Sequence, residues 1–431
     1  MTEKIADIAQ KYGFDQAAIR DKANDLGINV SKNDSIEENE LTKLHEILSF
    51  KYISKIEITN LWGTHNFVWE LDRSVNILIG MNGSGKSTIL NLVNSVINEG
   101  PTKNEDLLKY KYYYDEIIIY FNNGKILLFK KITETINSLT ESYGTDIGGQ
   151  ISIKIREDAK KYLNGSKKAL KLSNNIREEI TSEGAGYWAS NYPKTTKFKD
   201  LLTTKLISTF DNLVKDSKLS EFITRLKGVN TELDWDLQQL MGSFKNYQLK
   251  LKQNESIKLA PFDAQITELS RKKSANVDDL HELQQILVKK EQIKENIHAK
   301  KNQLFEILNT LFNNTQMPEL SKSISADADN DFVFIKNENS EIPLSKLSSG
   351  EKQLLILLMS AVLENEKPCV FLLDEPEISL HISWQEEFID HILQLNPNVQ
   401  IIMATHGTDM FLKDEWYFRT KNMNKLLKKQ S

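Results

Sequence analysis

The chain contains very little cysteine and no long hydrophobic run. Cys369 is the single cysteine among 431 residues, which excludes an internal disulfide framework and fits a reducing compartment. No apolar run approaches the roughly 20 residues that cross a bilayer, and the N-terminus lacks the basic-then-apolar order of a signal peptide. The sequence therefore predicts a cytoplasmic protein without a membrane partner.

The chain also lacks an excess of basic charge. Its net charge is −5, which argues against a strongly basic nucleic-acid coat but leaves room for a local basic patch. The hydrophobic fraction of 40% and the charged fraction of 27% are ordinary for a globular protein. Because 431 residues exceed what one core usually supports, we expect two or three domains.

Residues 1–50 have the pattern of a small all-helical domain. Apolar residues at helical spacing form three stripes: Ile5, Ile8 and Ala9; Ile19, Ala23 and Leu26; Leu41, Leu44 and Leu48. Gly13 interrupts the first stripe, and Gly27 is placed to cap the second helix. Ser35 and Glu38 have the spacing of a capping box, which predicts that the third helix starts there.

The segments "IADIAQKYG", "IRDKANDLGINV" and "LTKLHEIL" of this domain resemble the helical N-terminal domain of bacterial translation initiation factors. The alternative is a helical docking or nucleic-acid-contacting appendage of another kind.

From Lys51 the pattern changes to strands. The segments "YISKIEIT", "FVWEL" and "VNILIG" are short, β-rich and bounded by polar or glycine turns. "DEIIIYF" and "KILLFKKI" flank Asn122-Asn123-Gly124 and predict a hairpin, and "GQISIKI" adds a further candidate strand. Strands return at "DFVFIKN", so one α/β domain is expected on both sides of an insertion.

The insertion, from about residue 155 to 325, is expected to be mostly helical. One set of residues steps by three and four as a heptad seam with two lysines: Leu283, Ile286, Lys290, Ile293, Ile297, Lys300, Leu304, Ile307 and Leu311. An earlier set has similar spacing: Phe222, Leu226, Val229, Leu233, Leu237, Leu240 and Phe244. Pro261 and "RKKSANVDD" lie between the two seams. The pattern predicts an antiparallel helical arm, with an ordinary helical subdomain as the alternative.

These patterns divide the chain into four parts. Residues 1–50 form the N-terminal domain and residues 51–155 the first lobe of an α/β head. Residues 156–328 form the inserted arm or subdomain, and residues 329–431 form the second lobe.

A phosphate-binding loop follows the strand "VNILIG". Gly80-x-x-x-x-Gly85-Lys86-Ser87 lies between an apolar strand and an amphipathic helix, the context that this motif requires. Glycines let backbone N–H groups curl around phosphates, Lys86 neutralises phosphate oxygens, and the Ser87 hydroxyl is a ligand for Mg²⁺. The predicted ATP contacts in this loop are Gly80, Asn82, Gly83, Ser84, Gly85, Lys86, Ser87 and Thr88.

Two further strands end in functional groups. "VFLLDE" is continuously apolar before two acids, which is typical of a strand buried on both faces in a parallel sheet, and a surface Asp-Glu pair would not explain the apolar run. Asp374 is predicted to hold Mg²⁺ through water. Glu375, pointing the opposite way along the strand, is predicted to orient and deprotonate a water molecule. "VQIIMATH" ends in His406, a candidate hydrogen-bond donor to the γ-phosphate and the lytic water.

"LSSGEKQ" immediately precedes a long apolar helix. Small residues at a helix N-terminus make an anion site, because the first N–H groups lack partners and the helix dipole adds positive potential. Ser349 and Gly350 are the candidate contacts. The alternative for this segment alone is a serine cap without a ligand.

Together, the phosphate loop, "LSSGEKQ", "FLLDEPE" and His406 resemble an ABC-type ATPase head, with ATP and Mg²⁺ as the implied ligands. "DEPEISLHISWQ" followed by "QIIMATH" is similar to the branch that contains chromosome-maintenance, recombination-repair and overcoming-lysogenization-type ATPases. The resemblance implies that Ser349 and Gly350 of one copy cap the phosphate held by Lys86 of another. It thus implies an ATP-sandwiched homodimer, with residues 378–381 along the interface.

The sequence departs from the family pattern at two points. No glutamine is found at the usual coupling position after the first helix, and "THGTD" replaces the Ser-Pro that often follows the histidine. The adenine contact is open, because Trp62, His65 and Phe67 are candidates but each is equally explained by sheet packing.

Two functions from different classes follow. The first is a sensor or scaffold ATPase of an anti-phage system with a separate effector protein, a nuclease, as in Septu-like, retron-associated or PARIS-like systems, which the resemblance implies. The alternative is a DNA-repair or DNA-end-binding ATPase, with nucleic-acid contact through lysines of the arm and the tail. These lysines are Lys289, Lys290, Lys300, Lys301, Lys425, Lys428 and Lys429. The sequence after "DEPE" disfavours a transporter motor.

Overall fold

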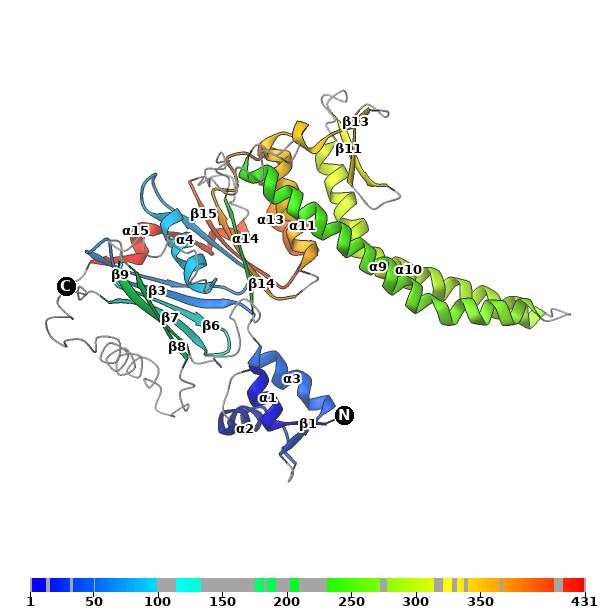
Figure 1. The fold of residues 1–431 in the computed structure, drawn as a ribbon, viewed down its shortest axis with the longest axis horizontal. Coiled ribbons are helices and arrows are strands. Elements are labelled where there is room, and N and C mark those ends of the chain that lie inside the picture. Colours follow the sequence, from blue (N-terminus) through cyan, green and yellow to red (C-terminus); the bar gives the residue numbers. More distant parts are fainter. Residues whose placement is uncertain are drawn as a thin grey trace. The chain divides into compact units, whose positions relative to one another are not determined.

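The computed structural model divides into two compact units. The first comprises Met1–Ile207, Pro368–Glu375 and Gln400–Ser431, and the second comprises Ser208–Lys367 and Pro376–Val399. The structure describes residues 2–12, 16–31, 34–49, 51–98, 114–132, 175–181, 184–190, 202–208, 231–271, 277–313, 321–327, 332–336, 340–364, 367–406 and 414–429. The predicted fold class, an α/β head with a parallel sheet, a phosphate loop and an inserted helical arm, is confirmed (Figure 1).

The first 50 residues form three helices around a core of their own. The helices are α1 (Ile5–Tyr12), α2 (Gln16–Asp25) and α3 (Glu38–Leu48). Their apolar stripes, from Ile5 to Leu48, form one buried cluster. Gly27 has a φ of +67°, as expected for a glycine that closes a helix.

This N-terminal domain is not all-helical. Strand β1 (Thr2–Lys4) pairs antiparallel with β2 (Ser35–Glu37). The predicted capping box is wrong, because Ser35 lies in the ribbon and the cap residue of α3 is Glu37, which makes no side-chain cap bond. The Ser35 hydroxyl is instead 2.7 Å from the hydroxyl of Ser31. Pairing of β1 with β2 thus overrides the local capping-box pattern, although Ser35 and Glu38 are residue types that this pattern requires.

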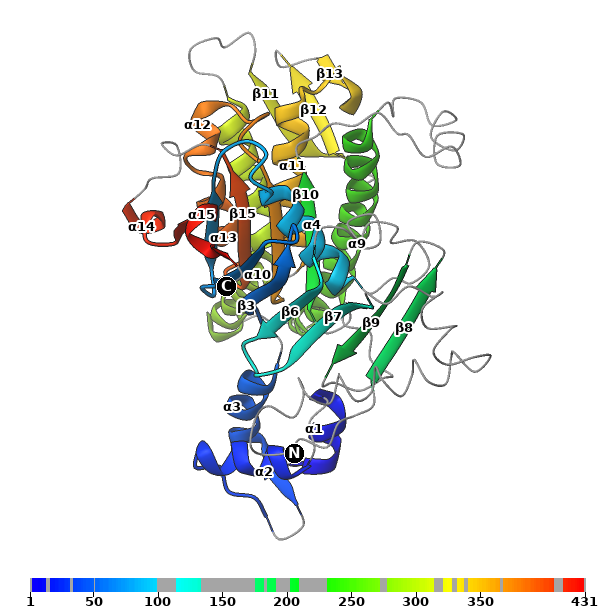
Figure 2. The same ribbon diagram turned by 90° about the vertical axis from the view of Figure 1, so that its left-hand side faces the viewer.

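A seven-stranded sheet forms one layer of the first unit (Figure 2). Its order is β17 (Leu427–Lys429), β4 (His65–Glu70), β3 (Ile53–Leu61), β6 (Glu116–Phe121), β7 (Ile126–Ile132), β9 (Gly184–Ser190) and β8 (Asn175–Thr181). The hairpin β6–β7 turns at Asn122-Asn123-Gly124 as predicted, with Gly124 at a φ of +76°. The candidate strand at residues 149–155 lies outside the described residues.

The expectation of a mostly helical segment from about residue 155 is wrong for its first part. β8 and β9 pair with each other and extend the seven-stranded sheet, and β10 (Thr203–Ser208) joins the second sheet. Strand pairing to β7 decides this outcome, since an open sheet edge accepts further strands.

The second sheet of this unit carries the predicted functional strands. Its order is β10, β14 (Cys369–Asp374), β15 (Val399–Thr405), β5 (Val75–Ile79) and β16 (Thr420–Asn422). β15 and β16 both run parallel to β5. Every residue of β14 and β15 is buried, as expected for continuously apolar strands inside a parallel sheet. Helix α4 (Lys86–Ile97) follows β5, and its buried face joins the core with residues of both sheets.

The last described residues add two short helices, α14 (Asp414–Tyr417) and α15 (Met423–Leu426). Two short strands, β16 and β17, also lie in this part of the described chain.

The second unit contains the arm. Helices α9 (Glu232–Ser270) and α10 (Val277–Phe312) run side by side and antiparallel (Figure 1), with Phe244 beside Phe305, Glu255 beside His298 and Asp263 beside Lys290. At 1.5 Å per residue, 36 residues make α10 about 54 Å long. The predicted arm is confirmed, although Phe222, Leu226 and Val229 of its first seam lie outside the described residues.

Pro261 lies between the two seams, as the sequence analysis noted, but it does not end the first helix of the arm. It lies inside α9, which continues to Ser270. A proline removes one intrahelical hydrogen bond, and packing against the neighbouring helix maintains the helix through this loss.

The rest of the second unit surrounds the base of the arm. It contains β11 (Lys322–Ala326), β12 (Phe332–Lys336), β13 (Ser340–Ile342), the short helix η3 (Leu344–Lys346), α11 (Ser349–Leu363), α12 (Ile382–Gln385) and α13 (Phe388–Leu395). β11, β12 and β13 form a three-stranded antiparallel sheet. Phe332 of this sheet packs on Phe244 and Phe305 of the arm, with ring centroids 4.9 and 5.1 Å away.

Among the helices of the described residues, none combines the length and the apolar character needed to cross a membrane.

Candidate functional site

The loop between β5 and α4 has the shape of a phosphate cradle. Gly83 and Gly85 have left-handed φ angles of +76° and +91°, and Gly85 is the cap residue of α4. A Cβ on Gly80 would lie 2.8 Å from the Ser84 Oγ and 3.1 Å from the Cβ of Met423. Side chains at these positions would therefore strain or crowd the loop, as expected where backbone N–H groups must approach an anion.

The other predicted loop contacts are arranged around this turn. The Ser84 N–H donates to the Met81 carbonyl at 3.1 Å, and the buried Ser84 Oγ makes no hydrogen bond in the structure. Asn82 is exposed at the tip of the loop, and Thr88 is half-buried in the first turn of α4. An unsatisfied buried hydroxyl in a loop of this shape fits a ligand that brings acceptor oxygens.

Lys86 lies inside the curve of the loop. Its side chain is buried, and the Nζ donates to the carbonyls of Gly80 at 2.9 Å and Met81 at 3.3 Å. The same Nζ lies 3.1 Å from the Nδ1 of His406. The loop backbone thus holds the ammonium at the place where the motif needs a positive charge for phosphate oxygens.

Ser87 and Asp374 meet across the sheet edge. The Ser87 Oγ donates to the Asp374 Oδ1 at 2.9 Å, although the two residues are far apart in the sequence. Mg²⁺ prefers oxygen ligands and is usually held by one or two protein groups together with substrate phosphates. Among the described residues, no group of three His, Cys, Asp or Glu side chains could hold a metal ion. The Ser87–Asp374 pair fits Mg²⁺ bound jointly with a phosphate.

Glu375 has a backbone conformation that the strand pattern did not predict. It follows the last residue of β14 with a left-handed φ of +50°, and its N–H donates to the Ala404 carbonyl at 2.8 Å. The prediction that it simply alternates with Asp374 along the strand is therefore wrong, because the chain turns at Glu375. Strained non-glycine residues are concentrated at functional sites.

His406 joins Glu375 to the phosphate loop. Its Nε2 contacts the Glu375 Oε1, and its Nδ1 is 3.2 Å from the Gly80 carbonyl. Glu375 is buried and His406 is partly exposed. The ends of β5, β14 and β15 thus bring together Lys86, Ser87, Asp374, Glu375 and His406 within one unit.

The segment "LSSGEKQ" leads into α11 and forms its first turn, in the second unit. Ser348 caps the helix, with its Oγ accepting from the Glu351 N–H at 3.3 Å and the Glu351 Oε2 accepting from the Ser348 N–H at 2.8 Å. Ser349 is exposed at the first helical position. A Cβ on Gly350 would clash with the Ser379 carbonyl oxygen, so only glycine permits this packing. Ser349 is thus exposed beside the Ser348 cap, whereas Gly350 is buried.

Residues 376–381 pack against the same helix. The Ser379 hydroxyl bonds to the Gln353 Oε1, and the Gln353 Nε2 donates to the Pro376 carbonyl at 3.4 Å. Ile378 remains 60% exposed. His381 caps α12, with the Ser383 N–H donating to its Nδ1 at 3.3 Å.

Sequence reasoning missed several residues that build these sites. Gln353 is buried and holds residues 376–379, and Glu351 accepts from the Lys322 Nζ at 2.5 Å. Lys352 forms an ion pair of 2.7 Å with Asp234 at the start of the arm. Gln353 could have been found from the sequence, because it is a polar residue on the buried face of an apolar helix. Glu351 and Lys352 could not, because their partners are far away in the sequence.

The three adenine candidates differ in their surroundings. Phe67 is fully buried in the core, edge-on to Trp69, so sheet packing accounts for it. The His65 Nδ1 is 2.7 Å from the Thr64 Oγ1. Trp62 packs against the phosphate loop at Gly85.

Most of the chain matches a known protein family. Residues 52–411 match the AAA ATPase domain family. A retron Vc95 probable ATPase of Vibrio cholerae serotype O1 biovar El Tor is 24% identical over 394 residues, which cover 84% of this chain and 69% of that protein.

Solved structures with lower similarity include two Smc heads. The Smc head domain with an extended coiled coil bound to the C-terminal domain of ScpA, derived from Pyrococcus furiosus, has a TM-score of 0.40 and 15% identity, with 88% of this chain and 96% of that chain covered. The SMC head domain from Thermotoga maritima has a TM-score of 0.33 and 13% identity, with 82% and 89% covered. These similarities are too distant to support a functional argument. The family match covers most of the chain, and the chain therefore belongs to the AAA ATPase domain family and is an ATP-hydrolysing enzyme.

Proposed function

We propose that the first unit holds and hydrolyses ATP with the residues that meet at the ends of β5, β14 and β15. The observation that carries this proposal is the convergence of five side chains: Lys86, Ser87, Asp374, Glu375 and His406. The predicted loop residues supply backbone donors for the phosphates. Ser87 and Asp374 would hold Mg²⁺, which neutralises charge on the β- and γ-phosphates when bound.

The chemical step needs a base beside the γ-phosphate. Water attacks the γ-phosphorus, the bond to the β–γ bridging oxygen breaks, and ADP leaves with that oxygen. Glu375 accepts the proton of the attacking water, and Lys86 neutralises the charge that develops on the phosphate oxygens. His406 orients the Glu375 carboxylate through their contact and donates a hydrogen bond to the γ-phosphate. A strained backbone and a fixed histidine partner support a preorganised base.

We propose further that two copies complete each other's site. Ser349 and Gly350 of one copy would cap the γ-phosphate held by Lys86 of its partner, which makes a C2 dimer with two ATP molecules. The exposed side chains of Ser349 and Ile378 support this proposal. Gly350 and Gln353 hold residues 376–381 against the start of α11. The start of this helix and residues 376–381 would therefore belong to the same dimer face.

Mass photometry with ATP and Mg²⁺ tests the dimer. Glu375→Gln should accumulate as a dimer, because binding is retained and water activation is lost. Adding Ser349→Arg to Glu375→Gln should return the protein to monomers, since a bulky cation then occupies the capping turn. Ser345→Arg, at an exposed position before α11, is the matched control and should remain dimeric. A Ser349→Arg protein that dimerises and hydrolyses ATP like the parent would contradict the shared site.

We propose that the chain works in the cytoplasm as a sensor or scaffold subunit of an anti-phage complex with a separate effector, a nuclease. A relative named as a retron ATPase supports this context. The Glu375→Gln protein, purified from its native host with ATP and Mg²⁺, should bring the effector with it, and Lys86→Ala should not. Glu375→Gln protein that copurifies with no nuclease, and whose parent has the same turnover with and without phage extract, would contradict this role.

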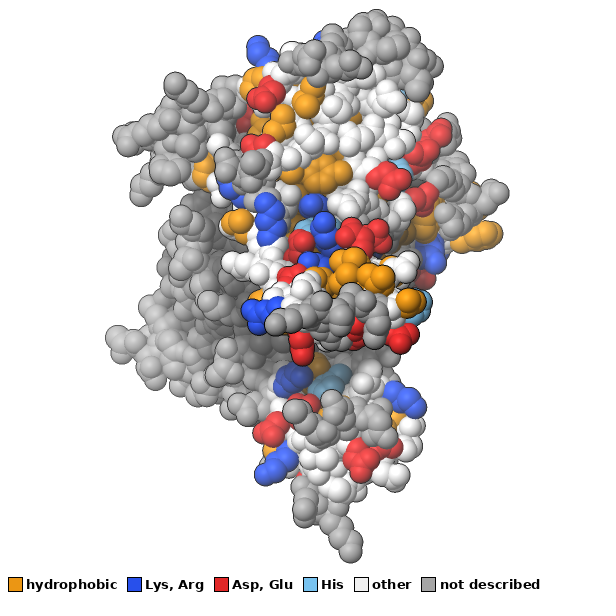
Figure 3. Space-filling view, turned by 90° about the vertical axis from the view of Figure 1, so that its right-hand side faces the viewer, with side chains coloured by type: hydrophobic (Ala, Val, Ile, Leu, Met, Phe, Trp, Pro, Cys, Tyr) orange, Lys and Arg blue, Asp and Glu red, His pale blue; other side chains and the backbone are white. Residues whose placement is uncertain are grey.

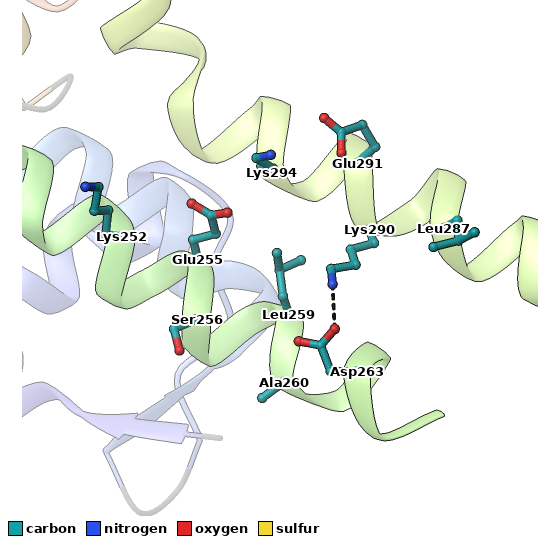
Figure 4. Close-up of a pocket in the computed structure, with 10 residues that line it drawn as sticks. All are labelled: Lys252, Glu255, Ser256, Leu259, Ala260, Asp263, Leu287, Lys290, Glu291 and Lys294. Carbon is teal, nitrogen blue, oxygen red and sulfur yellow. Dashed lines mark hydrogen bonds and ion pairs between the residues drawn. The ribbon is translucent and has the colours of Figure 1, made fainter. Parts of the chain in front are cut away.

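The alternative, a DNA-end-binding ATPase, receives little support from the arm. The face seen in Figure 3 carries basic, acidic and hydrophobic side chains interspersed with one another. Lys290 donates to Asp263 at 2.5 Å (Figure 4), and Lys300 donates to the Gln394 carbonyl at 3.1 Å. Burial, followed by the nearby charge of Lys252, lowers the pKa of Lys301. These contacts compete with phosphate binding.

Salt dependence distinguishes the two functions. DNA affinity that falls steeply with salt and rises with ATP would favour the repair function. Weak DNA affinity that does not respond to ATP is expected here.

We also propose that the four-part division stands, with residues 1–50 as an appendage, residues 51–155 and 329–431 as the two lobes of the head, and residues 156–328 as the insertion. The separate core of the first helices supports the first boundary.

A further inference from the structure

The turn between β3 and β4 has an unusual backbone. Asn60, Trp62 and Gly63 all have left-handed φ angles, of +56°, +55° and +72°. Left-handed conformations are uncommon for residues with a side chain, and for a bulky residue such as tryptophan they are costly. A turn that repeats the conformation over so few residues needs an explanation outside the turn itself.

Hydrogen bonds hold the turn in this conformation. The Asn60 N–H donates to the Asn66 Oδ1 at 3.0 Å, and the Asn60 Nδ2 donates to the Asp115 Oδ2 at 2.9 Å. The Gly63 N–H donates back to the Asn60 carbonyl at 2.9 Å. The turn is therefore fixed to its own hairpin and to the residue before β6, and the direction of Trp62 is fixed with it.

The indole of Trp62 lies on Gly85 of the phosphate loop. A Cβ on Gly85 would clash with the Trp62 Cζ2 and would lie only 2.6 Å from its Cη2. The indole thus takes the space that a side chain at Gly85 would need, and it is partly buried against the core that α4 shares with both sheets. The contact is made at the residue that caps α4 and precedes Lys86.

Gly83 provides an informative contrast. It also has a left-handed φ, but no atom lies within 4 Å of the place where its Cβ would be. Gly85 is therefore restricted twice, by its backbone angle and by the indole, whereas Gly83 is restricted by its backbone angle alone.

We propose that Trp62 is a positioning residue for the phosphate loop. Its indole packs against Gly85 and stabilises the left-handed conformation of that residue. This conformation directs the first N–H groups of α4 toward the phosphates and positions the Cα and Cβ atoms of Lys86. Trp62 acts on the triphosphate through the loop, so its effect on affinity does not depend on the nucleobase of the nucleotide. This inference rests on the proposed role of the loop in binding ATP.

Nucleotide affinity measured by calorimetry tests the proposal. Trp62→Ala should weaken ATP and GTP by the same factor, on the order of tenfold, because the misplaced loop holds the triphosphate that both nucleotides share. Trp62→Phe should recover most of the affinity, since a smaller ring still lies on Gly85. Glu70→Ala, at an exposed position at the other end of β4, is the control and should bind like the parent. Thermal melting confirms that each variant is folded.

A double-mutant cycle gives a readout that a general loss of stability would not produce. Gly85→Ala should cost less affinity in the Trp62→Ala background than in the parent, because the clash with the indole is absent. Gly83→Ala should cost the same in both backgrounds, since its position meets no atom.

The outcomes separate this inference from the function on which it rests. If the Lys86→Ala protein binds ATP like the parent, the proposed role of the loop in binding ATP is itself wrong. If Lys86→Ala loses ATP while Trp62→Ala binds normally, or while Trp62→Ala loses ATP but keeps GTP, the positioning role is wrong and the loop function stands. Additive effects of Trp62→Ala and Gly85→Ala would also overturn the positioning role.

Discussion

Strand β14 and helix α10 both depend on apolar residues, yet they bury them to different extents. All six residues of β14 are buried, and the strand leads directly into Asp374 and Glu375. In α10, which has 36 residues, the buried ones are Ile286, Leu304, Ile307, Leu308 and Phe312. Most of its seam is polar or partly exposed, and Leu287 is 49% exposed.

The difference indicates how each region performs its function. A strand buried on both faces cannot shift without moving the site residues at its end, so the geometry for chemistry is rigid. A two-helix arm with a partly polar seam has less apolar contact along its length and can change partners or bend at lower cost. Four predictions test this contrast, from the largest expected effect to the smallest.

Lys86→Ala should weaken ATP binding by up to about 100-fold, because a buried charge-assisted contact to phosphate contributes up to about 3 kcal/mol. Isothermal calorimetry with ATP and Mg²⁺ measures this. Lys290→Ala, a lysine on the arm, is the control and should bind ATP like the parent. Equal affinities for the parent and Lys86→Ala would remove Lys86 from the site.

Two histidines paired with glutamate distinguish the regions by turnover. His406→Ala should lower the ATPase rate by about 100-fold or more, since it removes the partner of the proposed base. His298→Ala removes the arm pair with Glu255, 2.7 Å long, and should leave the rate within about twofold. Steady-state phosphate release measures both. Comparable rates for the two variants would mean that the His406–Glu375 pair has no part in hydrolysis.

The same leucine-to-alanine change should have different effects on stability in the two regions. Leu372→Ala in β14 leaves a cavity and should lower the free energy of unfolding by about 2–5 kcal/mol. Leu287→Ala on the arm, where the side chain is half-exposed, should cost less than about 1 kcal/mol. Urea unfolding followed by circular dichroism provides the comparison. Equal costs would show that the arm seam is as tightly packed as the sheet.

Lys290→Ala should have the smallest effect on stability. Its ion pair with Asp263 is 2.5 Å long but partly exposed, with 31% and 57% of the two side chains accessible. Such pairs contribute about 0–1 kcal/mol and are screened by salt. Urea unfolding at low and high salt should give a difference from the parent that shrinks with salt. A difference in the free energy of unfolding that is large and independent of salt would show that the Lys290–Asp263 pair is not a weak, solvent-screened ion pair.

Much of the architecture could be predicted because its signals are local. The turn at Gly124, the strand–loop–helix around Lys86 and the closing of α2 at Gly27 each depend on a few adjacent residues. The predictions failed where distant segments compete for the same residues. Ser35 pairs with the first strand instead of capping α3, and β8 and β9 join a sheet edge within a segment expected to be helical.

The site shows the same division. Motif spacing identified Lys86, Ser87, Asp374, Glu375 and His406 as candidates, since each follows an apolar strand or belongs to a phosphate loop. It did not predict the left-handed turn at Glu375 or the contact of Trp62 with Gly85, because both depend on hydrogen bonds and packing between segments far apart in the sequence.

The sequence by itself determined the local elements of the candidate site: the phosphate loop is one contiguous motif, and Asp374, Glu375 and His406 each follow an apolar run, so neighbouring residues alone identify them. Only the tertiary structure decided which of these groups meet. The ends of β5, β14 and β15 bring Ser87 to Asp374 and His406 to Glu375 through a sheet whose strand order is set by burial and long-range pairing, neither of which adjacent residues encode.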